Sequence, residues 1–182
     1  MKIKKNIFEP HFEKLALEEG IEVEKKYESA SSKLITFLDM ADYNDDLRVK
    51  SLSLKIPYKN NIICVHYEVG DIKLGTIESA FSEINKLPQF DITTRSHFKR
   101  LIFRNKNILK VNSKKEKFKK RLEKLLSETE LELIARKTLF LPETKSINYN
   151  IKTEFSLSFD DNLEVLMPLI SFYKSLIDWS KE

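Results

Sequence analysis

Alternating apolar and polar residues predict a β-hairpin before the middle of the chain. Residues 52–56 alternate Leu and Ile with Ser and Lys, residues 57–61 are turn-forming, and residues 62–69 alternate again. A period of two residues places every second side chain on the same face of a strand. The alternation changes phase near Lys50 and Ser51, which predicts a β-bulge at that point.

Several other strands are predicted. Residues 151–159 alternate strictly, which is typical of a strand with one solvated face. Residues 21–27 fit an edge strand or a continuation of the preceding element. Two strands are expected to flank an asparagine-containing turn at 105–107. Residues 131–141 are predicted to be extended.

Helical periodicity marks three segments. Residues 10–19 begin with a proline and end before Gly20, which suits a left-handed C-cap. Ser113 and Glu116 have the spacing of a capping box in front of an amphipathic helix. The last segment, 161–179, carries apolar residues at helical spacing, and a proline within it marks either a kink or the start of its second half.

Two segments, 29–40 and 72–84, fit either a helix or a strand and stay open. Short connections and consecutive strands favour an antiparallel sheet over a parallel one. We therefore predict a single α+β domain over residues 1–182, with an antiparallel β-sheet of about six to eight strands. About three helices are expected to pack on this sheet, including a long C-terminal helix.

The composition indicates a folded protein of the cell interior. Apolar residues make up 41% and charged residues 33% of the 182 residues, which is enough apolar material for a core. No apolar run approaches the roughly 18 residues that cross a bilayer, and residues 1–11 lack the apolar region of a signal peptide. Cys64 is the only cysteine, so no internal disulfide can form and a cytoplasmic location is the simplest expectation.

Glycine is scarce, and Gly20, Gly70 and Gly75 are the only three. Phosphate-binding loops need several glycines close together, because their backbone approaches the ligand at positive φ angles. Neither of the two common nucleotide-binding motifs occurs, and the sequence predicts no cofactor.

Basic residues are concentrated in residues 95–124, where thirteen Lys and Arg accompany only two Glu. The favoured interpretation is a solvated surface, or one whose charge is compensated by the acidic N-terminal third. The alternative is a binding surface for nucleic acid, anionic lipid or an acidic protein. The candidate residues of such a surface are Arg95, Lys99, Arg100, Arg104, Lys114, Lys115, Lys117, Lys119, Lys120 and Arg121.

Cys64, His66 and Glu68 are spaced two residues apart on a predicted strand, so they share one face. A thiolate–imidazole pair or part of a metal site could form there, because a neighbouring histidine can lower the pKa of a thiol. We favour the alternative of a small buried cysteine with a histidine at the sheet margin. The other histidines, His11 and His97, complete no zinc-binding spacing, so no metal site is predicted.

Asp42, Asn44 and Asp46 begin like a calcium-binding loop. The pattern then fails, because Leu47 replaces the required glycine and Ser53 stands where the bidentate glutamate belongs. A turn is therefore favoured over a calcium site.

The C-terminal segment is rich in apolar residues and is more consistent with a core helix than with a partner-binding helix. If part of it is exposed, its aromatic side chains are expected to anchor an interface. These interface candidates are Phe172, Tyr173 and Trp179.

Short motifs are spread over most of the chain. They are Leu15-Ala16 with Gly20, Leu87-Pro88-Gln89-Phe90, Val111-Asn112-Ser113, and the apolar stretch 169–179. In this order they resemble a loosely related set of uncharacterised bacterial proteins, some of which carry membrane segments. The resemblance implies one domain. It implies no activity, because those proteins have none assigned.

These features predict a non-catalytic protein-binding or accessory module of the bacterial cytoplasm, similar to an adaptor or an immunity protein. The prediction rests on few glycines, few histidines, one cysteine and no recognisable site motif. The alternative is a nucleic-acid-binding protein that uses the basic segment 95–124. A thiol-dependent enzyme that uses Cys64 and His66 is third.

Overall fold

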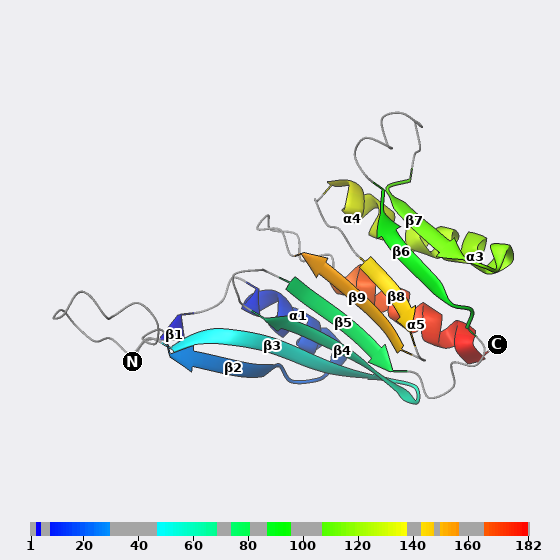
Figure 1. Ribbon diagram of the computed structural model, residues 1–182. Helices are drawn as coiled ribbons and strands as arrows, with labels where there is room; N and C mark the ends of the chain where they lie inside the picture. The colour runs from blue at the N-terminus through cyan, green and yellow to red at the C-terminus, as the bar shows by residue number, and fades with distance from the viewer. Residues whose placement is uncertain are drawn as a thin grey trace.

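The strands that the structure describes form one β-sheet in the computed structural model (Figure 1). The structure describes residues 3–4, 8–29, 47–68, 74–80, 87–95, 107–137, 143–147, 150–156 and 166–181. The strands are β1 (Ile3–Lys4), β2 (Glu24–Ser29), β3 (Leu47–Tyr58), β4 (Asn61–Glu68), β5 (Leu74–Ala80), β6 (Phe90–Thr94), β7 (Leu109–Ser113), β8 (Glu143–Ile147) and β9 (Asn150–Ser156). The helices are α1 (Glu9–Glu19), α3 (Glu116–Glu128), α4 (Leu131–Lys137) and α5 (Leu166–Lys181).

The described strands follow the order β1-β3-β4-β5-β9-β8-β6-β7, and β2 also pairs with β3. Every pairing among them is antiparallel except the two-residue contact of β1 with β3. Strands β3, β4 and β5 are consecutive, whereas β9 lies between β5 and β8. The predicted α+β class with an antiparallel sheet and a C-terminal helix is confirmed.

The described helices lie on one face of the sheet, behind the strands in the view of Figure 1. Helix α1 contacts β3, α5 contacts β4, and α3 contacts β7. Apolar side chains from the two layers meet between them, where burial removes their surface from water. The largest fully buried side chains include Phe12, Leu15, Leu52, Leu54, Ile56, Ile63, Ile77, Ile92, Phe172 and Tyr173.

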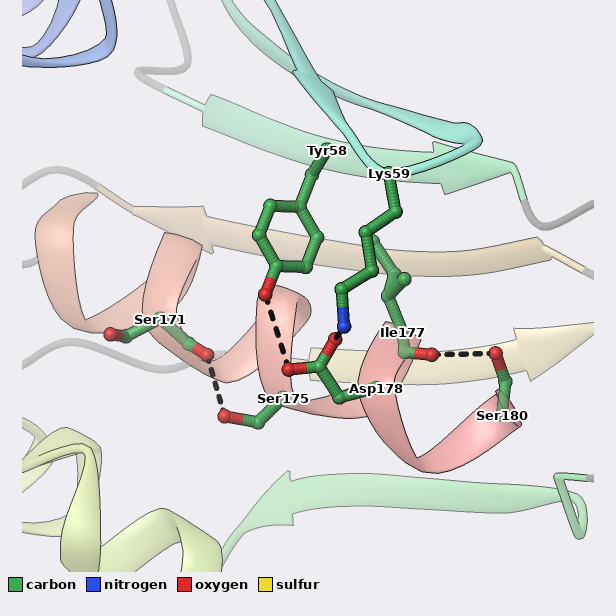
Figure 2. Close-up of polar contacts among 7 residues, drawn as sticks. All are labelled: Tyr58, Lys59, Ser171, Ser175, Ile177, Asp178 and Ser180. Carbon is green, nitrogen blue, oxygen red and sulfur yellow. Dashed lines mark hydrogen bonds and ion pairs between the residues drawn. The ribbon is translucent and has the colours of Figure 1, made fainter. Parts of the chain in front are cut away.

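The predicted hairpin is confirmed as β3 and β4, which are joined by a turn at Lys59 and Asn60. Figure 2 shows how its tip contacts α5. The Tyr58 hydroxyl donates to Oδ2 of Asp178 over 3.1 Å, and Lys59 forms an ion pair with the same carboxylate. Lys59 has a φ of 54°, in the left-handed region that is uncommon outside glycine. One carboxylate of α5 therefore fastens the hairpin tip to the helical layer.

The predicted β-bulge is also confirmed. In the pairing of β2 with β3, Lys26 lies opposite Ser51, whereas the next residue, Tyr27, lies opposite Val49. Lys50 is therefore the extra residue of the bulge, at the point where the alternation of the sequence changes phase.

Helix α1 and the edge strand after it follow the sequence signals. Gly20 ends α1 with a φ of 67°, and the N–H of Ile21 donates to the carbonyl of Ala16 over 2.9 Å. Only glycine adopts this conformation without steric cost. Among the described strands, β2 pairs with β3 alone, as expected for an edge strand.

Strand pairing decides the structure of the segments that fit either a helix or a strand, as far as the structure describes them. Within 72–84, β5 pairs with β4 on one side and with β9 on the other. Strand β9 accounts for the alternation of 151–159 as far as Ser156. Helix α5 continues past Pro168, so this proline does not end it. Most of 29–40 and of the turn at 105–107 lies outside the described residues.

The capping box predicted in front of α3 is wrong. The helix begins at Glu116 with Lys115 as its N-cap, and no side chain caps it. Ser113 is the last residue of β7 and pairs with Phe90, and its hydroxyl donates to the carbonyl of Gln89 over 3.0 Å. Sheet pairing therefore keeps Ser113 extended, too far before the helix to cap it.

The extended structure predicted for 131–141 is wrong over its described part. Residues 131–137 form helix α4. Leu131 and Ala135, four residues apart, are both buried, which is the spacing of one helical face. Burial of this face decides between two structures that the local sequence allows.

Glu132 attaches α4 to the sheet. Its carboxylate accepts a hydrogen bond from the backbone N–H of Ile108 and another, over 3.0 Å, from the N–H of Leu109. Among the described strands β7 is the last in the order, so the carboxylate satisfies backbone donors at the start of a strand that has one described neighbour.

Candidate functional site

Helix α3 presents a basic surface to solvent. Its apolar stripe, Leu122, Leu125 and Leu126, is buried in the core, so its polar residues lie on the opposite side. Four lysines on or next to this side are exposed, and none of them forms an ion pair with a described residue. We call these four the α3 basic surface: Lys114, Lys115, Lys117 and Lys120.

Two other lysines of α3 have partners on the helix itself. Lys119 is half-buried and lies 3.6 Å from Glu116, and Lys124 lies 3.3 Å from Glu128. Such helical ion pairs are worth only a few tenths of a kcal/mol. Their charges are nevertheless matched, which sets them apart from the α3 basic surface.

Acidic residues of the N-terminal third pair with lysines outside α3. These pairs are Lys25 with Glu9 and Glu13, Lys174 with Glu19 at 2.7 Å, and Lys55 with Glu24 at 2.9 Å. Hydrogen bonds to Glu13 and Glu9 raise the pKa of the Lys25 ammonium. These four carboxylates therefore do not neutralise the lysines of α3, as the sequence had suggested the acidic N-terminal third would do.

Of the candidates before α3 in the predicted basic segment, the structure describes only Arg95, which lies away from the α3 basic surface. Arg95 follows β6, where its N–H donates to the carbonyl of Ile108 over 2.8 Å, and its side chain is half-buried. Phe90, at the other end of β6, pairs with Ser113, so Arg95 and Lys114 lie roughly 15 Å apart along the strands. The remaining candidates, Lys99, Arg100 and Arg104, lie outside the described residues.

Arg121 and Trp179, which the sequence assigned to two different sites, contact each other. The guanidinium of Arg121 lies 4.1 Å from the centre of the Trp179 ring. Phe118 packs edge-on against Trp179, with 6.3 Å between the ring centres, and against Phe90, with 5.7 Å. The contact is a cation–π interaction that links α3 to α5.

Phe172 and Tyr173, interface candidates only if this part of the chain is exposed, lie in the core, as the favoured interpretation of the C-terminal segment expects. Their exposed fractions are 1% and 0%, because both lie on the side of α5 that packs into the core. The Tyr173 hydroxyl contacts that of Thr153 at 2.8 Å and donates to the carbonyl of Ile77 over 3.0 Å. Tyr173 is therefore a buried polar link between α5 and the sheet.

Cys64, His66 and Glu68 lie on β4 and alternate with its buried residues, on the sheet face away from the helices. Side chains two residues apart on a strand are separated by roughly 7 Å, too far for a direct thiol–imidazole hydrogen bond. His66 Nδ1 instead lies 2.8 Å from Ser53 Oγ. Burial raises the pKa of the Cys64 thiol, and the nearby Lys55 opposes this effect. This environment disfavours a reactive thiolate.

In the described part of the chain, no group of three or more His, Cys, Asp or Glu side chains is arranged to hold a metal ion. Asp42, Asn44 and Asp46 of the calcium-like pattern lie outside the described residues, whereas Leu47 and Ser53 both belong to β3.

Two hollows are lined by residues at or next to the ends of α3. A hollow of about 520 Å³ adjoins the α3 basic surface, since Lys114 and Lys115 line it together with Asp91, Asn112 and Ser146. A groove of about 880 Å³ lies between α1, the turn from α3 to α4, and the start of α5.

Within the described ranges, every helix is too short or too polar to cross a lipid bilayer. The resemblance to uncharacterised bacterial proteins stays a prediction, because no family model, curated protein or solved structure matches the chain.

Proposed function

We propose that this chain is a non-catalytic binding module that binds a polyanionic macromolecule through the α3 basic surface. The observation that carries the proposal is the set of four exposed lysines without an ion pair to any described residue. Like charges held close together repel one another, and a partner with closely spaced negative charges relieves that repulsion. The cytoplasmic location expected from the single cysteine belongs to the same proposal.

The position of these lysines on a well-packed helix supports the proposal. Lys117 and Lys120 are three residues apart on a helix, which places them on the same side about one turn apart. The helix is held by its buried leucine stripe and by the contact of Arg121 with Trp179. A surface fixed in this way has little backbone freedom to lose when it binds.

A matched pair of double variants tests the proposal. K117E/K120E reverses two charges of the α3 basic surface. K14E/K26E reverses two exposed lysines of α1 and β2 that also have no ion pair to a described residue. Each substitution changes the net charge by two, so both double variants lower it from +4 to zero.

We expect the wild type and K14E/K26E to be retained on a heparin column at low salt, and K117E/K120E to elute much earlier. Salt dependence is expected because phosphate-like and sulfate-like contacts release counterions. Equal elution of the two double variants would contradict the proposal, since net charge alone would then explain retention.

Protein binding, the first expectation from the sequence, is a second candidate function, and the groove of about 880 Å³ favours it. Leu15, Leu166 and Met167 line it, and Met167 has an exposed fraction of 40%. Glu18 and Glu130 also line it and form no ion pair with a described residue, and these carboxylates outnumber the one lysine of the lining, Lys14. We propose a basic amphipathic segment of another protein as the occupant, because apolar side chains with nearby carboxylates suit it.

Comparative pull-downs with variants test this second function. Met167→Glu places a charge in the groove, whereas K117E/K120E leaves the groove residues unchanged. A partner that is lost with Met167→Glu and kept with K117E/K120E is the expected result. A partner that both variants keep would show that the groove is not its binding site.

A further inference from the structure

We infer that the polyanion bound by the α3 basic surface is the phosphate backbone of a double-helical nucleic acid, contacted without regard to base sequence. This inference rests on the proposed binding function of the surface and adds the class of its partner. It follows from which groups the surface offers and which it lacks.

The charged groups suit phosphate rather than bases. Lysine binds a phosphate as a point charge, whereas arginine commonly reads guanine through two hydrogen bonds. The only arginine of α3, Arg121, is stacked over Trp179. Contacts to phosphates position a protein on a duplex but carry no direct sequence information. Binding without base preference is therefore expected.

A single strand fits this surface poorly, because single-strand binders stack bases on exposed aromatic rings. The aromatic residues that the structure describes on or against α3, Phe118 and Trp179, are partly buried against each other. The large exposed apolar residues among those described are Leu17, Tyr27, Ile62, Leu133 and Met167, and none of them lies on α3.

The spacing of charges also favours a duplex. From Lys114 to Lys120 the surface extends roughly 10 Å, given the rise per residue of a helix and of an extended chain. A duplex carries one charge per roughly 1.7 Å of its axis, so this length offers roughly six phosphates, and a single strand offers half as many. Four lysines can therefore each find a phosphate on a duplex.

Membranes and acidic proteins require features that the surface lacks. A helix that binds membranes inserts its apolar face, but that face of α3 is buried as Leu122, Leu125 and Leu126. The centres of protein interfaces are depleted in lysine and rich in aromatic, Met and Arg anchors. The α3 basic surface consists of lysine alone.

Binding to a labelled 20-base-pair DNA duplex of mixed sequence, followed by fluorescence anisotropy, tests the inference. The comparison probes are an RNA duplex of equal length, one strand of the DNA alone, polyglutamate, and vesicles of anionic phospholipid. Emission of Trp179 checks that each variant keeps the packing of α3 on α5.

We expect a duplex of either kind to bind at least roughly tenfold more tightly than the single strand, polyglutamate or vesicles, and unrelated duplex sequences to bind alike. Four phosphate contacts predict a slope of about −3.6 for log K against log salt, and Lys117→Ala is expected to reduce its magnitude by about 0.9. K117E/K120E is expected to lose binding while K14E/K26E keeps it.

Equally tight binding of the single strand, polyglutamate or vesicles would overturn the inference, as would a strong preference for one duplex sequence. The proposed function survives that result if K117E/K120E still loses the polyanion and K14E/K26E still binds it. If no polyanion binds the wild type at low salt, the inference and the proposed function both fail.

Discussion

The guanidinium of Arg121 lies over the ring of Trp179, 4.1 Å from its centre, so a charged side chain of α3 covers the only tryptophan of the chain. This contact joins the helix that carries the α3 basic surface to the last helix, α5. Because tryptophan emission responds to its surroundings, the same contact makes the docking of α3 measurable.

Replacing Arg121 with Gln is expected to lower the free energy of unfolding by about 1 kcal/mol, because the cation–π contact and the packing of the arginine stem are lost. Urea unfolding monitored by Trp179 emission measures this change. The matched control is Lys120→Gln, which alters the neighbouring exposed lysine and is expected to stay within about 0.5 kcal/mol of the wild type. Equal effects of the two substitutions would argue against a specific role of the Arg121 contact.

Replacing Tyr173 with Phe is expected to lower the free energy of unfolding by about 1–3 kcal/mol. The substitution removes a buried hydroxyl that contacts Thr153 and the carbonyl of Ile77, and it leaves that carbonyl without this donor. Urea unfolding measures the loss. Tyr27→Phe, at a residue that is 43% exposed, is the control and is expected to change stability little.

The raised pKa of the Tyr173 phenol is expected to lower the free energy of unfolding at alkaline pH. Burial raises the pKa of its phenol above the ordinary value of about 10, so folding favours the protonated form. Its contribution is therefore complete below about pH 10 and declines as the pH rises further, by up to about 1.4 kcal/mol per pH unit. Raised pKa values of several lysines act in the same direction. The alkaline decline should therefore be shallower in Tyr173→Phe than in the wild type.

Replacing Glu132 with Ala is expected to release the start of β7. Its carboxylate accepts from the N–H groups of Ile108 and Leu109, and loss of a charged acceptor costs about 1.5–3 kcal/mol. Hydrogen exchange should accelerate at these two amides in particular. Leu133→Ala, at the next and more exposed position of α4, is expected to leave their exchange close to that of the wild type. Unchanged protection in Glu132→Ala would show that other contacts hold this strand.

Cys64 is expected to react slowly with a thiol reagent at neutral pH. Burial raises the pKa of its thiol, so little of the reactive thiolate is present. Lys55→Ala is expected to slow the reaction further, because the positive charge that lowers this pKa is removed. Labelling rates measured between pH 7 and pH 10 test both statements. Labelling at neutral pH as fast as that of an exposed cysteine would restore the thiol-dependent enzyme as a candidate.

The sequence alone determined those elements whose signals are local. The hairpin of β3 and β4, the bulge at Lys50, and the end of α1 at Gly20 each depend on residues close together in the chain. Alternation, a change of phase and a glycine that tolerates a left-handed φ are sufficient for such features, because neighbouring residues decide them.

Contacts with residues distant in the chain decided the structure of segments whose local sequence suggested something else. Ser113 has the spacing of a helix cap, yet its pairing with Phe90 keeps it in β7. The sequence predicts that segment 131–141 is extended, yet burial of Leu131 and Ala135 makes its described part a helix. Local propensities of this size are small, and tertiary burial and pairing outweigh them.

The candidate site shows the same division. The sequence by itself concentrated positive charge in residues 95–124 and placed the lysines of α3 off its apolar stripe. Only the tertiary structure decided that Glu19 pairs with Lys174, a residue 155 positions away, and that Arg121 covers Trp179. An exposed charged side chain forms an ion pair with whichever opposite charge the fold brings near. That partner depends on tertiary packing rather than on position in the chain. The sequence already offers the four lysines of the α3 basic surface as candidates, and only the tertiary structure separates them from Lys119 and Arg121, which contact Glu116 and Trp179.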